Sequence, residues 1–224
     1  MAAAKNVIDF TGAGGNDDLL FSTIAEGIMN TGYSIIPTAL PAWLTDTLFT
    51  HQQLMEASKF KNAGVGRGKQ YLKNEFVRTD AISWITGETK AGKAWLSWVA
   101  DLQVYLNRRL FLGLFSFESH FAHYSPGDYY KRHYDAFKGE SNRVLSLIVY
   151  FNSNWLASDG GELVLYQDQY DQTGIKVVPL MGTIVAFLSE EFPHEVLAAN
   201  RDRYSIAGWF RLNTSMTDRV DPPR

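Results

Sequence analysis

The sequence predicts an α+β fold with a jelly-roll or barrel core. Apolar residues recur at helical spacing in the first half of the chain, and from Phe115 onward the spacing changes to two. Turn sequences then divide the chain into short strand-like runs: Pro126-Gly127, Asp159-Gly160-Gly161, Thr173-Gly174 and Met181-Gly182. Hydrophobic residues make up 46% of the 224 residues, which is typical of a folded globular chain. Helices followed by many short strands indicate helices that support such a core.

Composition and charge exclude several classes of partner. The 21 basic and 24 acidic residues give a net charge of −3, so no overall basic field exists to hold a nucleic acid. No apolar run approaches the roughly 18 residues that a membrane span needs, and the N-terminus does not resemble a signal peptide. Cysteine is absent, which excludes disulfides and thiolate metal sites and suits a cytoplasmic location. Metal ligands must therefore come from histidine and carboxylate side chains.

The first half is expected to supply helices. Residues 1–15 are glycine-rich at their end and are predicted to be flexible. A helix then begins near Asn16, which can cap it, and ends at Gly32 before a strand over 33–36. A second helix starts near Pro41, and a third runs from about Thr89 to Leu110. The apolar stripes that define these helices are Leu20, Ile24 and Ile28; Leu40, Leu44 and Leu48; and Trp95, Trp98, Val99, Leu102, Tyr105 and Leu106.

The stretch between the second and third helices differs in character. Residues 59–74 carry basic side chains and no acidic ones, and three glycines loosen the backbone: Lys59, Lys61, Arg67, Lys69 and Lys73, with Gly64, Gly66 and Gly68. Two interpretations stay open, a solvated mobile loop or a lid over 59–76 that orders on a substrate. The tail over 213–224 is polar, and we expect it to be poorly ordered.

Two strands of the second half have informative faces. In a strand over 143–151, one face is wholly apolar and the other includes the hydroxyls of Ser146 and Tyr150. In a strand over 203–211, Arg203 shares a face with Ser205, Ala207 and Trp209. An inward arginine beside small residues leaves room for an anion, because a buried guanidinium without a carboxylate is costly. The alternative for Tyr150 is a tyrosine of the barrel core with an incidental partner.

Three side chains predict a metal site. His133 and Asp135 stand at i and i+2 and point to one face of an extended strand, and His194 can join them from a neighbouring strand. Two imidazoles and one carboxylate on one face form the facial triad of non-haem Fe(II) oxygenases, in which open positions remain for other ligands. Two further histidines, His120 and His123, are at i and i+3 and should lie on opposite faces of a strand, so we expect both to be structural.

These pieces resemble the 2-oxoglutarate and Fe(II)-dependent oxygenases, and most closely the prolyl hydroxylases of the hypoxia-inducible-factor type and their bacterial relatives. The resemblance covers about 90 residues, from His123 to Arg211. It is carried by His123-Tyr124-Ser125-Pro126-Gly127, Tyr130-Lys131-Arg132-His133-Tyr134-Asp135, the run from Arg143 to Tyr150-Phe151-Asn152, Gly160-Gly161-Glu162-Leu163, Pro193-His194-Glu195-Val196, Arg203-Tyr204-Ser205-Ile206 and Trp209-Phe210. It implies a single oxygenase domain over 16–212, with a double-stranded β-helix (jelly-roll) core over 115–212 and N-terminal helices packed on one sheet.

The resemblance also implies roles for individual residues. His133, Asp135 and His194 would bind Fe(II), and Arg203 would hold the C5 carboxylate of 2-oxoglutarate. The other residues expected around 2-oxoglutarate are Tyr124, Ser146, Tyr150 and Trp209. Those expected on the substrate or lid side are Arg67, Lys69, Arg78, Asp80, Tyr130 and Arg143, with Arg143 paired to Asp80 across the mouth. Ala207 departs from the family, whose members carry a hydroxyl there. O2 is the second cosubstrate, and ascorbate is a further cofactor of such enzymes.

The implied reaction is hydroxylation of a prolyl residue in a protein, with release of succinate and CO2. Elongation factor Tu is the first candidate substrate, because it is a known type of target among bacterial relatives. An oxygenase acting on a free amino acid or small metabolite is an alternative, and a non-catalytic jelly-roll binding module is another. Nucleic acid demethylases carry a second arginine six residues after the first, where this chain has Trp209.

Overall fold

A computed structural model of the chain describes residues 17–63, 77–136 and 142–213. The predicted flexible N-terminus, most of the predicted lid and nearly all of the tail lie outside these residues. Within them, the helices are α1 (Asp18–Thr31), α2 (Ala42–Gln53) and α3 (Lys90–Leu110), with short 3-10 turns η1 (Ala57–Lys59) and η3 (Ala157–Asp159). No helix in this part of the chain is long and apolar enough to cross a membrane.

The strands of the described residues form two antiparallel sheets. The large sheet has the order β1-β9-β6-β11-β4-β3-β2 and the small sheet the order β5-β10-β7-β8. The large sheet contains β1 (Tyr33–Ile36), β2 (Lys61–Asn62), β3 (Ala81–Trp84), β4 (Ser116–Tyr124), β6 (Arg143–Tyr150), β9 (Ile184–Leu188) and β11 (Arg203–Arg211). The small sheet contains β5 (Tyr130–His133), β7 (Leu163–Leu165), β8 (Ile175–Val177) and β10 (His194–Val196). Two facing sheets with supporting helices confirm the predicted jelly-roll architecture.

The helices end and pack as their sequences indicate. Gly32 adopts a left-handed conformation with φ of 81°, and its N–H bonds to the carbonyl of Ile28 to close α1. Thr89 caps α3 by accepting a hydrogen bond from the N–H of Gly92 at 2.9 Å. The predicted cap Asn16 lies outside the described residues, and the carboxylate of Asp17 instead accepts a hydrogen bond from the indole of Trp98 at 2.7 Å.

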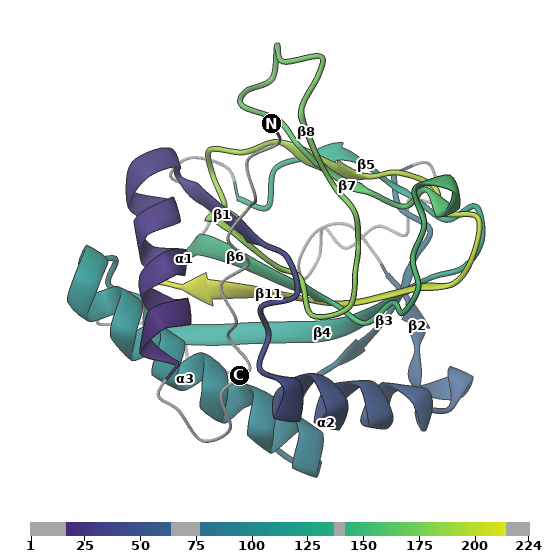
Figure 1. The fold of residues 1–224 in the computed structure, drawn as a ribbon, viewed down its shortest axis with the longest axis horizontal. Coiled ribbons are helices and arrows are strands. Elements are labelled where there is room, and N and C mark those ends of the chain that lie inside the picture. Colours follow the sequence, from purple (N-terminus) through teal and green to yellow (C-terminus); the bar gives the residue numbers. More distant parts are fainter. Residues whose placement is uncertain (1–16, 64–76, 137–141, 214–224) are drawn as a thin grey trace, which may run out of the picture.

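Two hydrophobic cores lie on opposite faces of the large sheet. Helices α1, α2 and α3 cover one face, and the small sheet covers the other (Figure 1). Strand β6 divides between them as its alternation predicts, with Leu145, Leu147 and Val149 against the helices and Ile148 and Tyr150 towards the small sheet. The space between the sheets is therefore where an inward side chain of the large sheet can meet one of the small sheet.

Candidate active site

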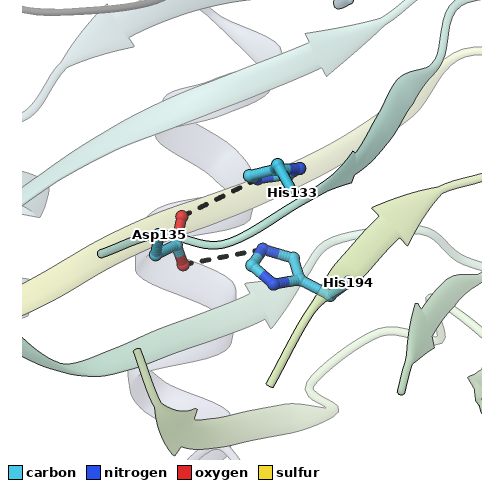
Figure 2. Close-up of side chains that lie close together, drawn as sticks. All are labelled: His133, Asp135 and His194. Carbon is cyan, nitrogen blue, oxygen red and sulfur yellow. Dashed lines mark ion pairs between the residues drawn. The ribbon is translucent and has the colours of Figure 1, made fainter. Parts of the chain in front are cut away.

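Three side chains converge where β5 of the small sheet ends. His133 is the last residue of β5, Asp135 follows two residues later, and His194 opens the neighbouring strand β10. One ligand atom from each lies within 4.8 Å of the others. Figure 2 shows the carboxylate of Asp135 facing both imidazoles. Its Oδ1 is 3.8 Å from Nε2 of His133, and its Oδ2 is 3.6 Å from Nε2 of His194. This arrangement could hold one metal ion.

The route by which Asp135 reaches this point differs from the expectation. The prediction that His133 and Asp135 share one strand is wrong, because β5 ends at His133 and Asp135 lies in a bend. The last β5 pair joins His133 to His194, and Asp135 lies beyond it. The carboxylate accepts a hydrogen bond from Ser146 of the large sheet at 2.6 Å. The bend therefore turns Asp135 from the small sheet towards β6.

Both imidazoles are oriented by the backbone. Nδ1 of His133 lies 2.7 Å from the carbonyl of Lys131, and Nδ1 of His194 lies 3.1 Å from the carbonyl of Phe192. A carbonyl oxygen only accepts, so each Nδ1 carries the hydrogen. In the neutral form of such a ring Nε2 keeps its lone pair, and both Nε2 atoms face Asp135, as metal ligands require.

Burial and neighbouring charges favour the protonation states that bind metals. Burial, reinforced by the proximity of His194, lowers the pKa of His133 to about 3, so this imidazole is neutral at neutral pH. Burial alone would raise the pKa of Asp135, but His194, His133 and Arg143 outweigh it and lower the pKa to about 2. A neutral imidazole and an ionised carboxylate are the forms that coordinate a divalent cation.

The core between the two sheets also borders a buried guanidinium with no acidic partner among the described residues. Arg203 is 2% exposed; its Nε donates to the carbonyl of Gly161 at 2.8 Å and its Nη1 to the hydroxyl of Ser205 at 3.4 Å. Its Cζ lies 4.9 Å from the ring centre of Tyr124 and 5.0 Å from that of Tyr150. A buried cation whose described hydrogen-bond partners are neutral suits an anionic ligand.

Tyr150 adds a second unsatisfied group to this pocket. Its hydroxyl is buried and makes no hydrogen bond of ordinary geometry to a described residue, although the guanidinium of Arg203 lies close enough to act on it as a donor, and the hydrogen of the phenol has no described acceptor. Burial raises its pKa to about 12 despite the charge of Arg203, so the phenol keeps its hydrogen and can donate it. Together the guanidinium and the phenol offer donors to one carboxylate, and they fit the distal carboxylate of 2-oxoglutarate.

Gly161 explains the position of the guanidinium and was not singled out from the sequence as a site residue. Its φ is 70°, and a Cβ there would approach Cδ of Arg203 to 3.1 Å and Cβ of Ala199 to 2.9 Å. Glycine is needed both for this backbone conformation and for the close approach of the arginine stem. The glycine pair at 160–161 was the available signal, because paired glycines after a strand often mark such an approach.

The predicted substrate-side residues lie around His133. The ring of Tyr130 stacks on that of His133 with 3.5 Å between centres, and Cζ of Arg78 lies 4.4 Å from the centre of the Tyr130 ring. Arg78 makes a two-point ion pair with Asp80, which is fully buried. Arg67 and Lys69 fall outside the described residues.

The predicted pair between Arg143 and Asp80 is wrong. Arg143 bonds to Glu118 at 2.8 Å, and Asp80 is taken by Arg78. Cζ of Arg143 also lies 3.7 Å from the ring centre of Trp209. Glu118 shares the inner face of β4 with Tyr124, and its place in that alternation was the sequence signal that could have identified it as the partner.

Ser146 and Trp209, both predicted to lie around 2-oxoglutarate, differ in their hydrogen bonding. Ser146 is engaged with Asp135 and with Ser189, and its contact with 2-oxoglutarate stays a prediction. The indole of Trp209 is buried and its Nε1 has no hydrogen-bond partner in the described part of the chain, so it too offers a donor in this region.

His120 and His123 lie on opposite faces of β4, as their spacing predicts. His120 is buried between the rings of Trp84 and Trp209, at 5.3 and 5.5 Å between centres. His123 bonds to Asp202 at 2.7 Å and stacks on Tyr204. Neither belongs to the group that could hold a metal.

Comparison with known proteins gives a consistent picture. A family model described as the 2OG-Fe(II) oxygenase superfamily matches residues 119–211. A prolyl-4-hydroxylase from Pseudomonas putida is 35% identical with a TM-score of 0.77, over 86% of this chain and 99% of that one. A prolyl hydroxylase from Trichoplax adhaerens, solved with a peptide fragment of the hypoxia inducible factor oxygen degradation domain, is 25% identical with a TM-score of 0.76, over 87% and 90%. A prolyl 4-hydroxylase from Phytophthora capsici, at 18% identity and a TM-score of 0.67 over 89% and 67%, shares the fold.

Proposed function

The chain belongs to the 2OG-Fe(II) oxygenase superfamily, as a dioxygenase that uses Fe(II), 2-oxoglutarate and O2, and we propose that it hydroxylates a prolyl residue within a protein substrate. The observation that carries the prolyl assignment is the 35% identity to the Pseudomonas putida prolyl-4-hydroxylase over 99% of that protein. The Trichoplax adhaerens enzyme, with its bound peptide, supports a segment of protein as the substrate.

In this proposal the three converging side chains hold the metal. His133 and His194 supply Nε2 atoms, and Asp135 supplies a carboxylate oxygen. Bound iron, with 2-oxoglutarate and O2, supplies the oxidation that inserts oxygen into a C–H bond, with succinate and CO2 as the other products. The protein's contribution is to orient these groups and to limit the access of water.

Arg203 and Tyr150 hold the cosubstrate. The guanidinium of Arg203 receives the C5 carboxylate, and the hydroxyl of Tyr150, whose hydrogen has no described acceptor, donates a further hydrogen bond to it. Tyr124, whose ring borders the guanidinium, forms the wall of the same pocket. Arg203 and Tyr150 are then both satisfied by one carboxylate.

The substrate would approach along the rim formed by Tyr130, Arg78 and Trp209. His133 and Asp135 are each partly exposed, so this side of the site can be reached from the surface. Arg143 stands nearby, close enough for its charge to lower the pKa of Asp135. Aromatic faces and fixed cations suit the ring and the backbone carbonyls of a prolyl segment.

Elongation factor Tu is the first candidate substrate, and mass spectrometry tests it. The purified enzyme is incubated with elongation factor Tu, Fe(II) and 2-oxoglutarate, with and without O2. We expect one oxygen atom to be added to a prolyl residue only when O2 is present, and His133→Ala to abolish the addition. His123→Ala is the matched control, because it removes a histidine that lies outside the metal group and should leave the reaction intact.

The possible outcomes distinguish a wrong choice of substrate protein from a wrong type of reaction. Modification of another protein in a cell extract would replace elongation factor Tu and keep the prolyl assignment. Succinate release with no modified protein would overturn the proposal and favour oxidation of a free amino acid or a small metabolite.

A further inference from the structure

A chain of buried hydroxyls ends on the carboxylate of Asp135. The hydroxyl of Ser146 on β6 lies 2.6 Å from Oδ2 of Asp135 and 2.9 Å from the hydroxyl of Ser189. Ser146 is 1% exposed and Ser189 is fully buried, so water does not compete for either group. A buried hydroxyl that bonds to a charged group contributes more than an ordinary neutral hydrogen bond.

The direction of these hydrogen bonds follows from the chemistry of the groups. An ionised carboxylate only accepts, so Ser146 must donate its single hydrogen to Asp135. The oxygen of Ser146 is then left as an acceptor, and Ser189 must donate to it. Each hydroxyl in the chain therefore has a defined orientation, and the negative charge of Asp135 aligns both.

We propose that Ser146, oriented by Ser189, is a positioning residue that fixes the carboxylate of Asp135 so that Oδ1 is presented to the metal ion. The role rests on the proposed function of Asp135 as a metal ligand. Oδ2 accepts the hydrogen bond from Ser146, whereas Oδ1 accepts none from a described residue, so Oδ1 is the oxygen with both lone pairs free for the ion. A carboxylate that gives one oxygen also leaves one more position open on the metal than a carboxylate that gives two, and this chemistry depends on open positions.

The position of Ser189 connects the segment that leads to His194 with the strand that carries Ser146. Ser189 follows β9, and its N–H bonds at 3.0 Å to the carbonyl of Val144, two residues before Ser146 in the chain. The segment that starts at Ser189 leads in five residues to His194. The same hydroxyl chain therefore ties the segment before one metal ligand to the carboxylate of another. The loss of either hydroxyl should loosen Asp135.

Binding of Mn²⁺ alone tests this role without turnover. The affinity is measured from the loss of the electron paramagnetic resonance signal of free Mn²⁺ on titration with protein. We expect Ser146→Ala to weaken binding by about 10- to 100-fold, the usual effect of removing a hydrogen bond to a ligand. Ser189→Ala should weaken it less, and Ser146→Thr, which keeps the hydroxyl, should restore most of the affinity.

Ser119→Ala is the matched control. Ser119 is 1% exposed and accepts a hydrogen bond from the indole of Trp95 at 3.0 Å, on the face of the large sheet that the helices cover. Its loss should lower the melting temperature and leave the Mn²⁺ affinity unchanged. Unchanged affinity in folded Ser146→Ala, or a loss in Ser119→Ala as large as that in Ser146→Ala, would overturn the positioning role.

If Ser146→Ala folds poorly, a spectroscopic measurement on Ser189→Ala tests the same positioning role. Binding of Co²⁺ to the Ser189→Ala protein should change its visible absorption relative to wild type, because Ser146 then lacks the donor that orients it and holds Oδ2 of Asp135 less firmly, so that this oxygen can join the metal more readily. An identical spectrum would contradict the role of the hydroxyl chain. Failure of the wild-type protein to bind Mn²⁺ at all would instead remove the metal assignment and, with it, the proposed function.

Discussion

Replacement of Arg203 by glutamine should have opposite effects on cosubstrate binding and on the stability of the ligand-free protein. The guanidinium is 2% exposed, and its described hydrogen-bond partners are the carbonyl of Gly161 and the hydroxyl of Ser205. No described carboxylate lies within 4.0 Å of it. A buried charge with only neutral partners is poorly compensated, whereas an amide in its place can still donate to Gly161.

The expected changes in affinity and stability follow from the lack of a described acidic partner for Arg203. Loss of one partner of a buried charge pair costs about 2 to 5 kcal/mol, so 2-oxoglutarate should bind about 30-fold to several-thousand-fold more weakly to Arg203→Gln. The free energy of unfolding without ligand should stay the same or rise by about 1 kcal/mol, because an uncompensated charge is removed. The two effects are measured by anaerobic calorimetry with Mn²⁺ in the site and by urea unfolding.

A ligand that lacks the carboxylate makes the test specific. The compound 2-oxopentanoate carries a methyl group where 2-oxoglutarate has its C5 carboxylate. Wild type should prefer 2-oxoglutarate by roughly the factor that the variant loses, and Arg203→Gln should bind the two compounds about equally. The reasoning fails if the variant keeps its preference for 2-oxoglutarate, or if it loses more than about 2 kcal/mol of stability while its affinity is unchanged.

Three further predictions concern single side chains. His133→Ala should abolish Mn²⁺ binding while leaving the melting temperature within a few degrees of wild type, and Mn²⁺ binding equal to that of His123→Ala would contradict its place in the metal group. Tyr150→Phe removes a hydroxyl whose hydrogen has no described acceptor, so the stability of the ligand-free protein should fall by less than about 1 kcal/mol, whereas 2-oxoglutarate should bind about 5- to 10-fold more weakly by calorimetry; equal affinity would exclude the hydrogen bond. Burial lowers the pKa of His120 from its ordinary value of 6.5 to about 3, so the unfolded chain takes up a proton below pH 6.5 that the folded chain does not. Stability should therefore be lost as the pH falls from 6.5 towards 3, by about 2 kcal/mol at pH 5, and urea unfolding of His120→Phe at pH 7 and pH 5 should show a loss smaller by that amount; equal losses would refute the shift.

Local periodicity was sufficient to predict most elements. The strand over 33–36 and the strand over 203–211 have the predicted bounds, and the third helix begins one residue after the predicted Thr89. These elements bury one face, so their side chains repeat with the period of the backbone and reveal it. The convergence of His133, Asp135 and His194 also followed from their residue types, because few other arrangements use two imidazoles and a carboxylate at this spacing.

Contacts that depend on packing between distant segments were not predictable in this way. The hydrogen bond from Ser146 to Asp135 requires the bend that ends β5, and the spacing of His133 and Asp135 gave no sign of a bend. Arg143 pairs with Glu118 and not with Asp80, because the carboxylate of Asp80 already pairs with Arg78, two residues before it. The sequence shows which charged residues are available to form ion pairs. Which of them pair depends on the distances between their side chains in the folded chain.

The two sheets contribute different parts of the site. Building the site therefore needs both strand pairing within each sheet and packing between the sheets. The small sheet places the two histidines, because pairing of β5 with β10 sets His133 opposite His194. The large sheet places the cosubstrate groups, because pairing of β6 with β11 sets Tyr150 opposite Ser205, two residues from Arg203. Neither ladder fixes the distance between metal and cosubstrate, since that distance depends on how one sheet packs on the other. Asp135 joins the two, because it leaves the small sheet and is held by a hydroxyl of the large one. Substitutions that shift the sheets relative to one another should therefore act on Asp135 before they act on either histidine.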